Sequence, residues 1–112
     1  MKVLIAGSRS ISDFDLSRYI PTGTELIITG GATGVDTIAE AYADKHKISK
    51  LIIRPEYSRY GKAAPLKRNE QMVDMADFVI VIWDGASKGA LYTANYAKKK
   101  NKAVQIITCK QP

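Results

Sequence analysis

The sequence contains one cysteine, one histidine and no apolar run long enough to cross a bilayer. The lone Cys109 excludes an internal disulfide within this sequence and is typical of a reducing compartment. A membrane-spanning helix needs about 20 apolar residues in a row, which the sequence lacks. His46 stands beside lysines, so neither a metal site nor a Ser-His catalytic pair is expected. We therefore expect a cytoplasmic protein with no metal and no membrane contact.

Motifs for P-loop nucleotide hydrolysis and for nucleic-acid recognition are also missing. The pattern Gly-x-x-x-x-Gly-Lys-Ser/Thr is absent, as are zinc-finger spacing, a helix-turn-helix pattern and RNA-binding aromatic motifs. The net charge of +6 comes partly from lysines at positions 98, 99, 100 and 102, where a helix is predicted to end. The helix dipole favours lysines there, and a solvated surface explains them. We expect no nucleic-acid partner, and a basic protein that associates with DNA is the lesser alternative.

Length and composition are typical of one folded domain over residues 1–112, because 46% of the residues are hydrophobic and 25% are charged. Segments of strand-forming residues alternate with segments of helical periodicity along the chain. Strands are predicted at residues 3–6, 26–29, 51–53, 78–83 and 104–107, and helices at residues 13–20, 34–46, 65–75 and after residue 88. The alternation predicts an α/β domain of three layers, in which a five-stranded parallel sheet has helices on both faces. We expect the strand order 3-2-1-4-5.

Residues 26–36 join a buried strand to a helix through a turn that contains three glycines. Backbone amides at the start of a helix lack internal partners, and glycines let an anion come close to them. The candidate phosphate contacts in this turn are Gly30, Gly31, Ala32, Thr33 and Gly34. Asp36 would repel a phosphate, so it either bonds a ribose hydroxyl or caps the helix. A tight turn without any ligand is the alternative explanation of these glycines.

Three polar turns follow predicted strands, at residues 7–10, 30–36 and 84–89. In open parallel sheets, ligands bind beyond the carboxyl ends of the strands, where the strand order reverses. In the order 3-2-1-4-5 the three turns lie at neighbouring strand ends and share one crevice. A simple connection explains each turn alone, whereas the three together favour a binding site.

Five short motifs together resemble a known family. In chain order they are Gly7-Ser8-Arg9, Gly30-Gly31-Ala32-Thr33-Gly34-Val35-Asp36, Tyr60-Gly61-Lys62-Ala63-Ala64, Arg68-Asn69 and Asp84-Gly85-Ala86-Ser87-Lys88-Gly89. They resemble the YspA-type branch of the SLOG superfamily over essentially the whole chain. That superfamily also contains the DNA-processing protein A family and the cytokinin-activating "lonely guy" phosphoribohydrolases. The resemblance implies a Rossmann-like fold and a pocket for nucleotides or nucleotide-derived ligands, and many members are thought to act as sensors.

The resemblance also implies that Arg68 and Asn69 face the pocket, where the Arg68 guanidinium would grip a phosphate with two bonds. Without the resemblance, Arg68 would be a solvated helix residue. Tyr57 and Tyr60 would either stack on a base or pack against the protein. The candidate ligand- or phosphate-binding residues are Gly7, Ser8, Arg9, Gly30, Gly31, Ala32, Thr33, Gly34, Asp36, Arg68, Asn69, Asp84, Gly85, Ser87, Lys88 and Gly89.

The turn after the fourth strand bears on catalysis. In the phosphoribohydrolases this turn reads Pro-Gly-Gly-x-Gly-Thr-x-x-Glu, and its glutamate is catalytic. By this resemblance, the threonine position holds Ala90 here and the glutamate position holds Thr93. Cleavage of an N-glycosidic bond needs a carboxylate near the ribose. Asp84 and Asp36 are the catalytic candidates that are left, each with a structural alternative.

We therefore expect a module that binds a nucleotide-derived small molecule, in order to sense, sequester or present it. Derivatives of NAD and ADP-ribose are among the candidate ligands. The alternative is an enzyme of the phosphoribohydrolase type that hydrolyses an N-glycosidic bond of a nucleotide. No cofactor is expected to be required, and a homo-oligomer is left open.

Overall fold

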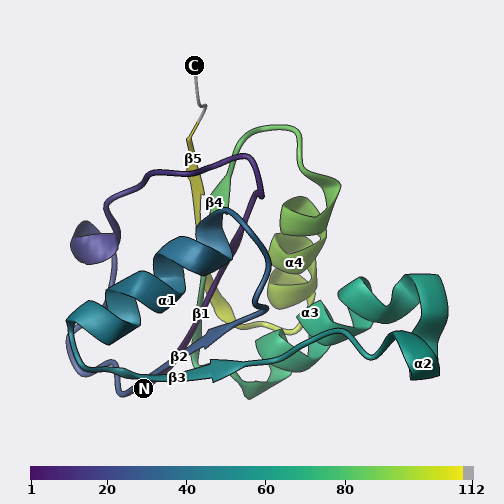
Figure 1. Ribbon diagram of the computed structural model, residues 1–112, viewed down its shortest axis with the longest axis horizontal. Helices are drawn as coiled ribbons and strands as arrows, with labels where there is room; N and C mark the ends of the chain where they lie inside the picture. Colours follow the sequence, from purple (N-terminus) through teal and green to yellow (C-terminus); the bar gives the residue numbers. More distant parts are fainter. Residues whose placement is uncertain (110–112) are drawn as a thin grey trace.

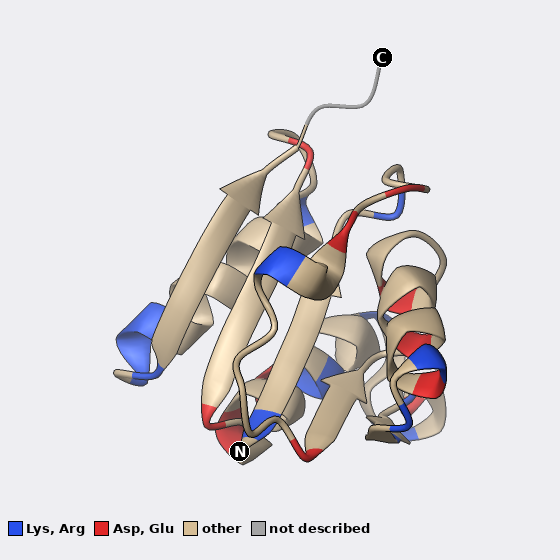
Figure 2. Ribbon diagram, turned by 90° about the vertical axis from the view of Figure 1, so that its left-hand side faces the viewer, with Lys and Arg blue, Asp and Glu red and all other residues tan. Residues whose placement is uncertain are grey.

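Parallel strands form the central sheet of the molecule (Figure 1). The computed structural model describes residues 1–109. Within them the strands are β1 (Lys2–Gly7), β2 (Leu26–Thr29), β3 (Ser49–Ile52), β4 (Phe78–Trp83) and β5 (Ala103–Thr108). Their order is β3-β2-β1-β4-β5 and all pairs are parallel, which confirms the predicted sheet. In Figure 2 the arrowheads accordingly point to one edge of the sheet, which we call the carboxyl edge.

Helices cover both faces of the sheet, as predicted (Figure 1). One face carries α1 (Val35–Lys45) and the 3-10 turn η1 (Leu16–Arg18), and the other carries α3 (Ala64–Met75) and α4 (Lys88–Lys99). Two short turns, α2 (Tyr57–Tyr60) and η2 (Gly61–Ala63), connect β3 to α3. None of the helices in residues 1–109 has the length and apolar character needed to span a membrane.

The apolar run of β4 explains the three-layer packing. Val79 and Val81 pack into the core cluster under α3 and α4, whereas Ile80 and Ile82 pack into the cluster under α1. Successive side chains of a strand point to opposite faces, so a strand covered on both faces is apolar at every position. The edge strand β5 has no buried residue. The sheet centre, around β1 and β4, is therefore its most buried part.

The predicted helix at residues 13–20 is wrong. The structure has only the 3-10 turn η1 there, and Asp15 caps it by accepting a hydrogen bond from the Ser17 amide (3.0 Å). Short polar side chains such as these bond nearby backbone groups and so compete with a continuous helix. No element was predicted between residues 53 and 65, where the structure contains α2 and η2. The other predicted elements agree with the structure within two residues at each boundary.

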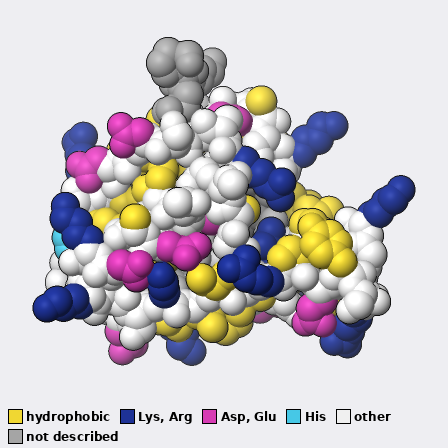
Figure 3. All heavy atoms as spheres, viewed as in Figure 1, with side chains coloured by type: hydrophobic (Ala, Val, Ile, Leu, Met, Phe, Trp, Pro, Cys, Tyr) yellow, Lys and Arg dark blue, Asp and Glu magenta, His cyan; other side chains and the backbone are white. Residues whose placement is uncertain are grey.

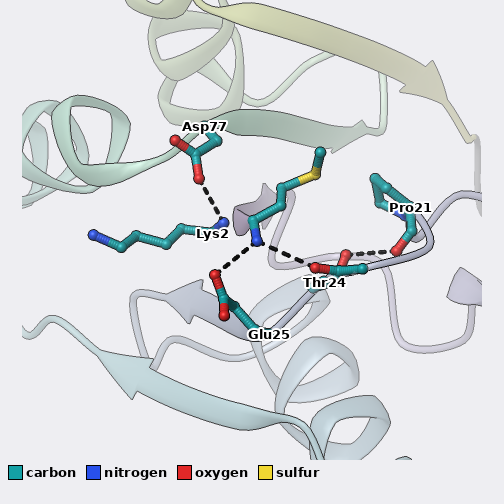
Figure 4. A network of polar contacts seen from close by, with 7 residues as sticks. Lys2, Pro21, Thr24, Glu25 and Asp77 are labelled. Carbon is teal, nitrogen blue, oxygen red and sulfur yellow. Dashed lines mark hydrogen bonds and ion pairs between the residues drawn. The ribbon is translucent and has the colours of Figure 1, made fainter.

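A network of polar contacts fixes the strands at the edge opposite to the carboxyl edge (Figure 4). The Lys2 amide, at the start of β1, donates to Asp77 just before β4 (2.8 Å). The ammonium group of Met1 donates to Glu25 (2.9 Å), which precedes β2. These contacts join the starts of three neighbouring strands at the edge opposite to the carboxyl edge.

Shortening Ile80 should test how much the β4 core contributes to stability. Ile80 is fully buried, so Ile80→Ala should lower the free energy of unfolding by about 2–5 kcal/mol. Leu91→Ala is the control, because Leu91 is 39% exposed on α4 and should cost about 0.5 kcal/mol or less. Urea denaturation measures the free energy of unfolding of both variants and of the natural protein. Equal losses in the two variants would contradict the assignment of Ile80 to the core.

Candidate functional site

A cavity of about 370 Å³ lies at the carboxyl edge. It is formed by the end of β1, by the turns that follow β1, β2 and β4, and by the facing sides of α3 and α4. Eight of the sequence-predicted site residues line it: Gly7, Arg9, Ala32, Asp36, Asn69, Asp84, Ser87 and Gly89. The other eight are not among its lining residues: Ser8, Gly30, Gly31, Thr33, Gly34, Arg68, Gly85 and Lys88. The three turns do meet in one crevice, although only half of the candidate residues border it.

The sequence analysis missed five lining residues: Ala6, Ser10, Met72, Ala90 and Thr93. Ala6, Met72, Ala90 and Thr93 are buried and form the wall of the cavity that belongs to the core. A sequence signal existed for Met72, because it follows Asn69 by three positions and so shares its helix face. The cavity thus combines a mostly apolar floor with polar groups from the turns.

Ser8 supports the site from beneath. It is fully buried, and its amide donates to the Ile82 carbonyl of β4 (3.0 Å). Its hydroxyl accepts a hydrogen bond from the Asp84 amide (2.9 Å), and its carbonyl accepts one from the Val35 amide (3.3 Å). Ser8 therefore connects the turn after β1 to both of the other turns.

Glycines allow these turns to approach one another. Gly34 has a positive φ of 77°, and a Cβ atom there would lie 2.5 Å from the Ser8 carbonyl oxygen. A Cβ atom at Gly31 would face Arg54 and Ile52, which do not line the cavity. Gly89 is different, because a Cβ atom there would meet nothing within 4 Å. Gly89 is thus a cavity-lining position at which a Cβ atom would displace no other part of the protein.

Asp36 brings a buried carboxyl group to the cavity. Its Oδ2 accepts a hydrogen bond from the Ala32 amide (3.1 Å), so the side chain closes the turn that leads into α1. Burial raises the pKa of this carboxyl group above its ordinary value. The hydrogen bond from Ala32 and the charge of Arg68 oppose that rise without cancelling it.

Arg68 is held inside the protein and is only 7% exposed. Its Nη1 donates to the carbonyls of Gly30 (2.7 Å) and Ile53 (3.4 Å), and its Nε donates to Asn69 Oδ1 (2.8 Å). Burial lowers the pKa of Arg68 and the neighbouring Asp36 raises it, but a guanidinium stays charged in any case. In this arrangement Arg68 positions the turn after β2, and it leaves the amide nitrogen of Asn69 as a donor at the cavity.

Asp84 stabilises the turn after β4. Its carboxylate accepts hydrogen bonds from the Ser10 hydroxyl (2.6 Å) and from the amides of Ala86 and Ser87 (2.8 Å each). These donors lower the pKa of Asp84 far below its ordinary value, so the group is ionised at any physiological pH. Thr93, at the position that corresponds to the glutamate of the phosphoribohydrolases, donates its hydroxyl proton to the Gly89 carbonyl (3.0 Å).

The candidate tyrosines and the lysine cluster near the end of α4 lie away from the cavity lining. Neither Tyr57, which is 58% exposed, nor Tyr60 lines it. Within the lysine cluster near the end of α4, Lys102 donates to the carbonyls of Asp74 and Ala76. Figure 3 shows basic side chains scattered around one face of the molecule with acidic ones between them.

No set of three or more His, Cys, Asp or Glu side chains within residues 1–109 is arranged to hold a metal ion.

Comparison with known families identifies this architecture. Residues 1–60 match the family described as the YspA, cpYpsA-related SLOG family. The chain belongs to this family. Searches of curated proteins and of solved structures found no significant match. Membership of the SLOG family indicates nucleotide-related binding or processing, and the match contains the turns after β1 and β2. The lining residues on α3 and at the start of α4 lie beyond the matched segment of this SLOG protein.

The opposite pKa shifts of Asp84 and Asp36 predict opposite effects of acid on stability. Because the pKa of folded Asp84 is lowered, its stabilisation is present above the unfolded-state pKa of about 4 and is lost as the pH falls further. The destabilisation caused by Asp84→Ala should therefore be larger at pH 7 than at pH 2.5.

Because the pKa of folded Asp36 is raised, its ionised form costs stability above that pKa. The stability of Asp36→Asn relative to the natural protein should therefore decrease in acid.

Urea unfolding of the three proteins between pH 2.5 and pH 7 measures both effects. Parallel pH profiles for the natural protein and Asp84→Ala would contradict the assignment of Asp84.

Proposed function

We propose that this SLOG protein binds a nucleotide-derived small molecule in the cavity at the carboxyl edge, in order to sense, sequester or present it. One observation carries the proposal: three turns and two helices surround a single cavity with an apolar floor and a polar rim. Sites for small molecules combine these features, and 370 Å³ is within the usual range of their volumes, about 300–1,000 Å³. Family membership supports a nucleotide-related ligand.

The lining residues match the parts of such a ligand. Ala6, Met72 and Ala90 offer apolar contact to the flat face of a base or to a sugar ring. Asp36 accepts hydrogen bonds and the Asn69 amide nitrogen donates them, and such polar groups fix the orientation of a bound molecule. Derivatives of NAD and ADP-ribose are suitable test ligands, since they combine bases, riboses and phosphates.

Binding without turnover is the better-supported form of the proposal. Thr93 is neutral, and its hydroxyl is engaged with Gly89. Asp84 is ionised, but it already accepts three hydrogen bonds from the protein. Thr93 offers no charge, and the three donors to Asp84 already stabilise its negative charge, which weakens what it can offer to the positive ribosyl group during cleavage.

Hydrolysis of an N-glycosidic bond is the second candidate function, and Asp36 is the residue that supports it. Its carboxyl group lines the cavity, and burial raises its pKa, as in many catalytic acids. Asp36 is thus the residue on which an enzymatic function would depend.

Filling the cavity should abolish ligand binding while the fold is preserved. Gly89→Val places two methyl groups in open space at the start of α4, so it should remove the thermal stabilisation that a bound nucleotide, NAD or ADP-ribose derivative gives. Gln71→Val is the matched control, since it puts the same β-branched residue on the exposed side of α3. Thermal shift assays of both variants against the ligand panel test this. An unchanged ligand response in Gly89→Val would place binding elsewhere.

Incubation with nucleoside monophosphates, NAD and ADP-ribose should separate binding from turnover. We expect to recover the ligand intact after the protein is denatured, with no free base detected by mass spectrometry. Many turnovers that are lost in Asp36→Asn would instead make the protein an enzyme. That result would be specific if Asp77→Asn, a change at the opposite edge of the sheet, kept the activity.

A further inference from the structure

Two of the turns that line the cavity already hold an anion of their own. Asp36 Oδ2 accepts from the Ala32 amide in the turn after β2. Asp84 Oδ1 accepts from the amides of Ala86 and Ser87 in the turn after β4. Turn amides of this kind are the groups that would otherwise bind a phosphate. In each of these two turns, backbone amides that could bind a phosphate are therefore engaged by a carboxylate of the chain itself.

Neighbouring amides are engaged as well. The Ala90 amide, in the first turn of α4, donates to the Ser87 hydroxyl (3.4 Å). The Val35 amide, at the start of α1, donates to the Ser8 carbonyl (3.3 Å). A phosphate bound at these amides would displace their bonds and lie beside a carboxylate, where like charges repel. Both effects disfavour phosphate inside the cavity.

The cations near the cavity offset this negative charge only in part, because the Arg68 charge acts on Asp36 from outside the lining. Among the lysines and arginines of residues 1–109, Arg9 alone lines the cavity, and its side chain is exposed to solvent. Arg68 is buried, and its guanidinium donates to Gly30, Ile53 and Asn69 instead of lining the cavity. The charged groups of the lining are therefore two aspartates and one exposed arginine.

We propose that the cavity recognises the uncharged, donor-rich nucleoside part of its ligand through Asp36 and Asp84, and that any phosphate stays at the mouth near Arg9. This inference rests on the proposed function and assigns the class of group that enters the cavity. Ionised carboxylates only accept hydrogen bonds, so they suit ribose hydroxyls and exocyclic amino groups. The apolar floor at Ala6, Met72 and Ala90 suits the base or sugar that carries those donors.

The arrangement predicts that phosphates contribute little to affinity. A charge-assisted hydrogen bond to a phosphate inside a site is typically worth roughly 10- to 150-fold in affinity. An exposed contact with Arg9 is screened by salt and is worth much less. A nucleoside should therefore bind within about tenfold of its monophosphate, and a second phosphate should add about threefold or less.

Titration calorimetry on the natural protein tests whether phosphates add little to affinity. One ligand series is adenosine, AMP, ADP and ADP-ribose, and two further series start from guanosine and from nicotinamide riboside and add phosphates in the same way. Each titration is made at low and at high potassium chloride concentration. A nearly constant affinity along a series, with weak salt dependence, supports the inference. An affinity that rises more than about tenfold with each phosphate and falls steeply with salt overturns it and leaves the proposed function intact. If no member of the panel binds, the proposed function fails and the inference fails with it.

Charge-removing variants give a second readout. Asp84→Asn keeps an oxygen for the Ala86 and Ser87 amides but removes the charge, so it should strengthen the binding of AMP relative to adenosine. Asp36→Asn should weaken adenosine binding by roughly tenfold or more, because a charged acceptor is lost. Asp77→Asn removes the same charge at the opposite edge and should change neither affinity. Equal effects of Asp84→Asn and Asp77→Asn on the AMP-to-adenosine ratio would contradict a role for Asp84.

Discussion

The hydrogen bonds of Ser8 are the interaction on which the cavity depends. Its buried amide, hydroxyl and carbonyl connect the turn after β1 to β4, to the Asp84 turn and to the start of α1. This close approach requires glycine nearby, because a Cβ atom at Gly34 would collide with the Ser8 carbonyl and one at Gly7 with the Ile82 carbonyl. Three loops from distant parts of the chain are thus fixed relative to one another, which is what a preformed binding site needs.

The two aspartates of the cavity show how the environment separates chemically identical groups. Donors from Ser10, Ala86 and Ser87 lower the pKa of Asp84, whereas burial raises the pKa of Asp36. Asp84 is therefore a permanent anion, and Asp36 is the group whose protonation changes more readily. Both carboxylates also take hydrogen bonds from their own turns, so each has a structural task beside any contact with a ligand.

The part of the chain that defines the family builds only one side of the cavity. Residues 1–60 contain β1, β2, α1 and the turns between them. Asn69, Met72 and the residues from Asp84 to Thr93 close the other side. Because parallel strands end at one edge, residues far apart in sequence meet there. Both halves of the chain are therefore needed to form the cavity.

The amino-acid sequence by itself determined the layer architecture and the edge of the sheet at which the polar turns meet. Apolar strands, helical periodicity and polar turns are local patterns, and parallel strands bring the turns to one edge. The rules of parallel sheets allow more than one strand order, and the structure confirmed the expected one. Only the tertiary structure decided which residues border the cavity. Arg68 fits the pattern of a phosphate ligand, yet its guanidinium bonds the Gly30 carbonyl, and the Cβ position of Gly31 faces Arg54. The direction of a side chain depends on partners distant in sequence, and no local pattern records them.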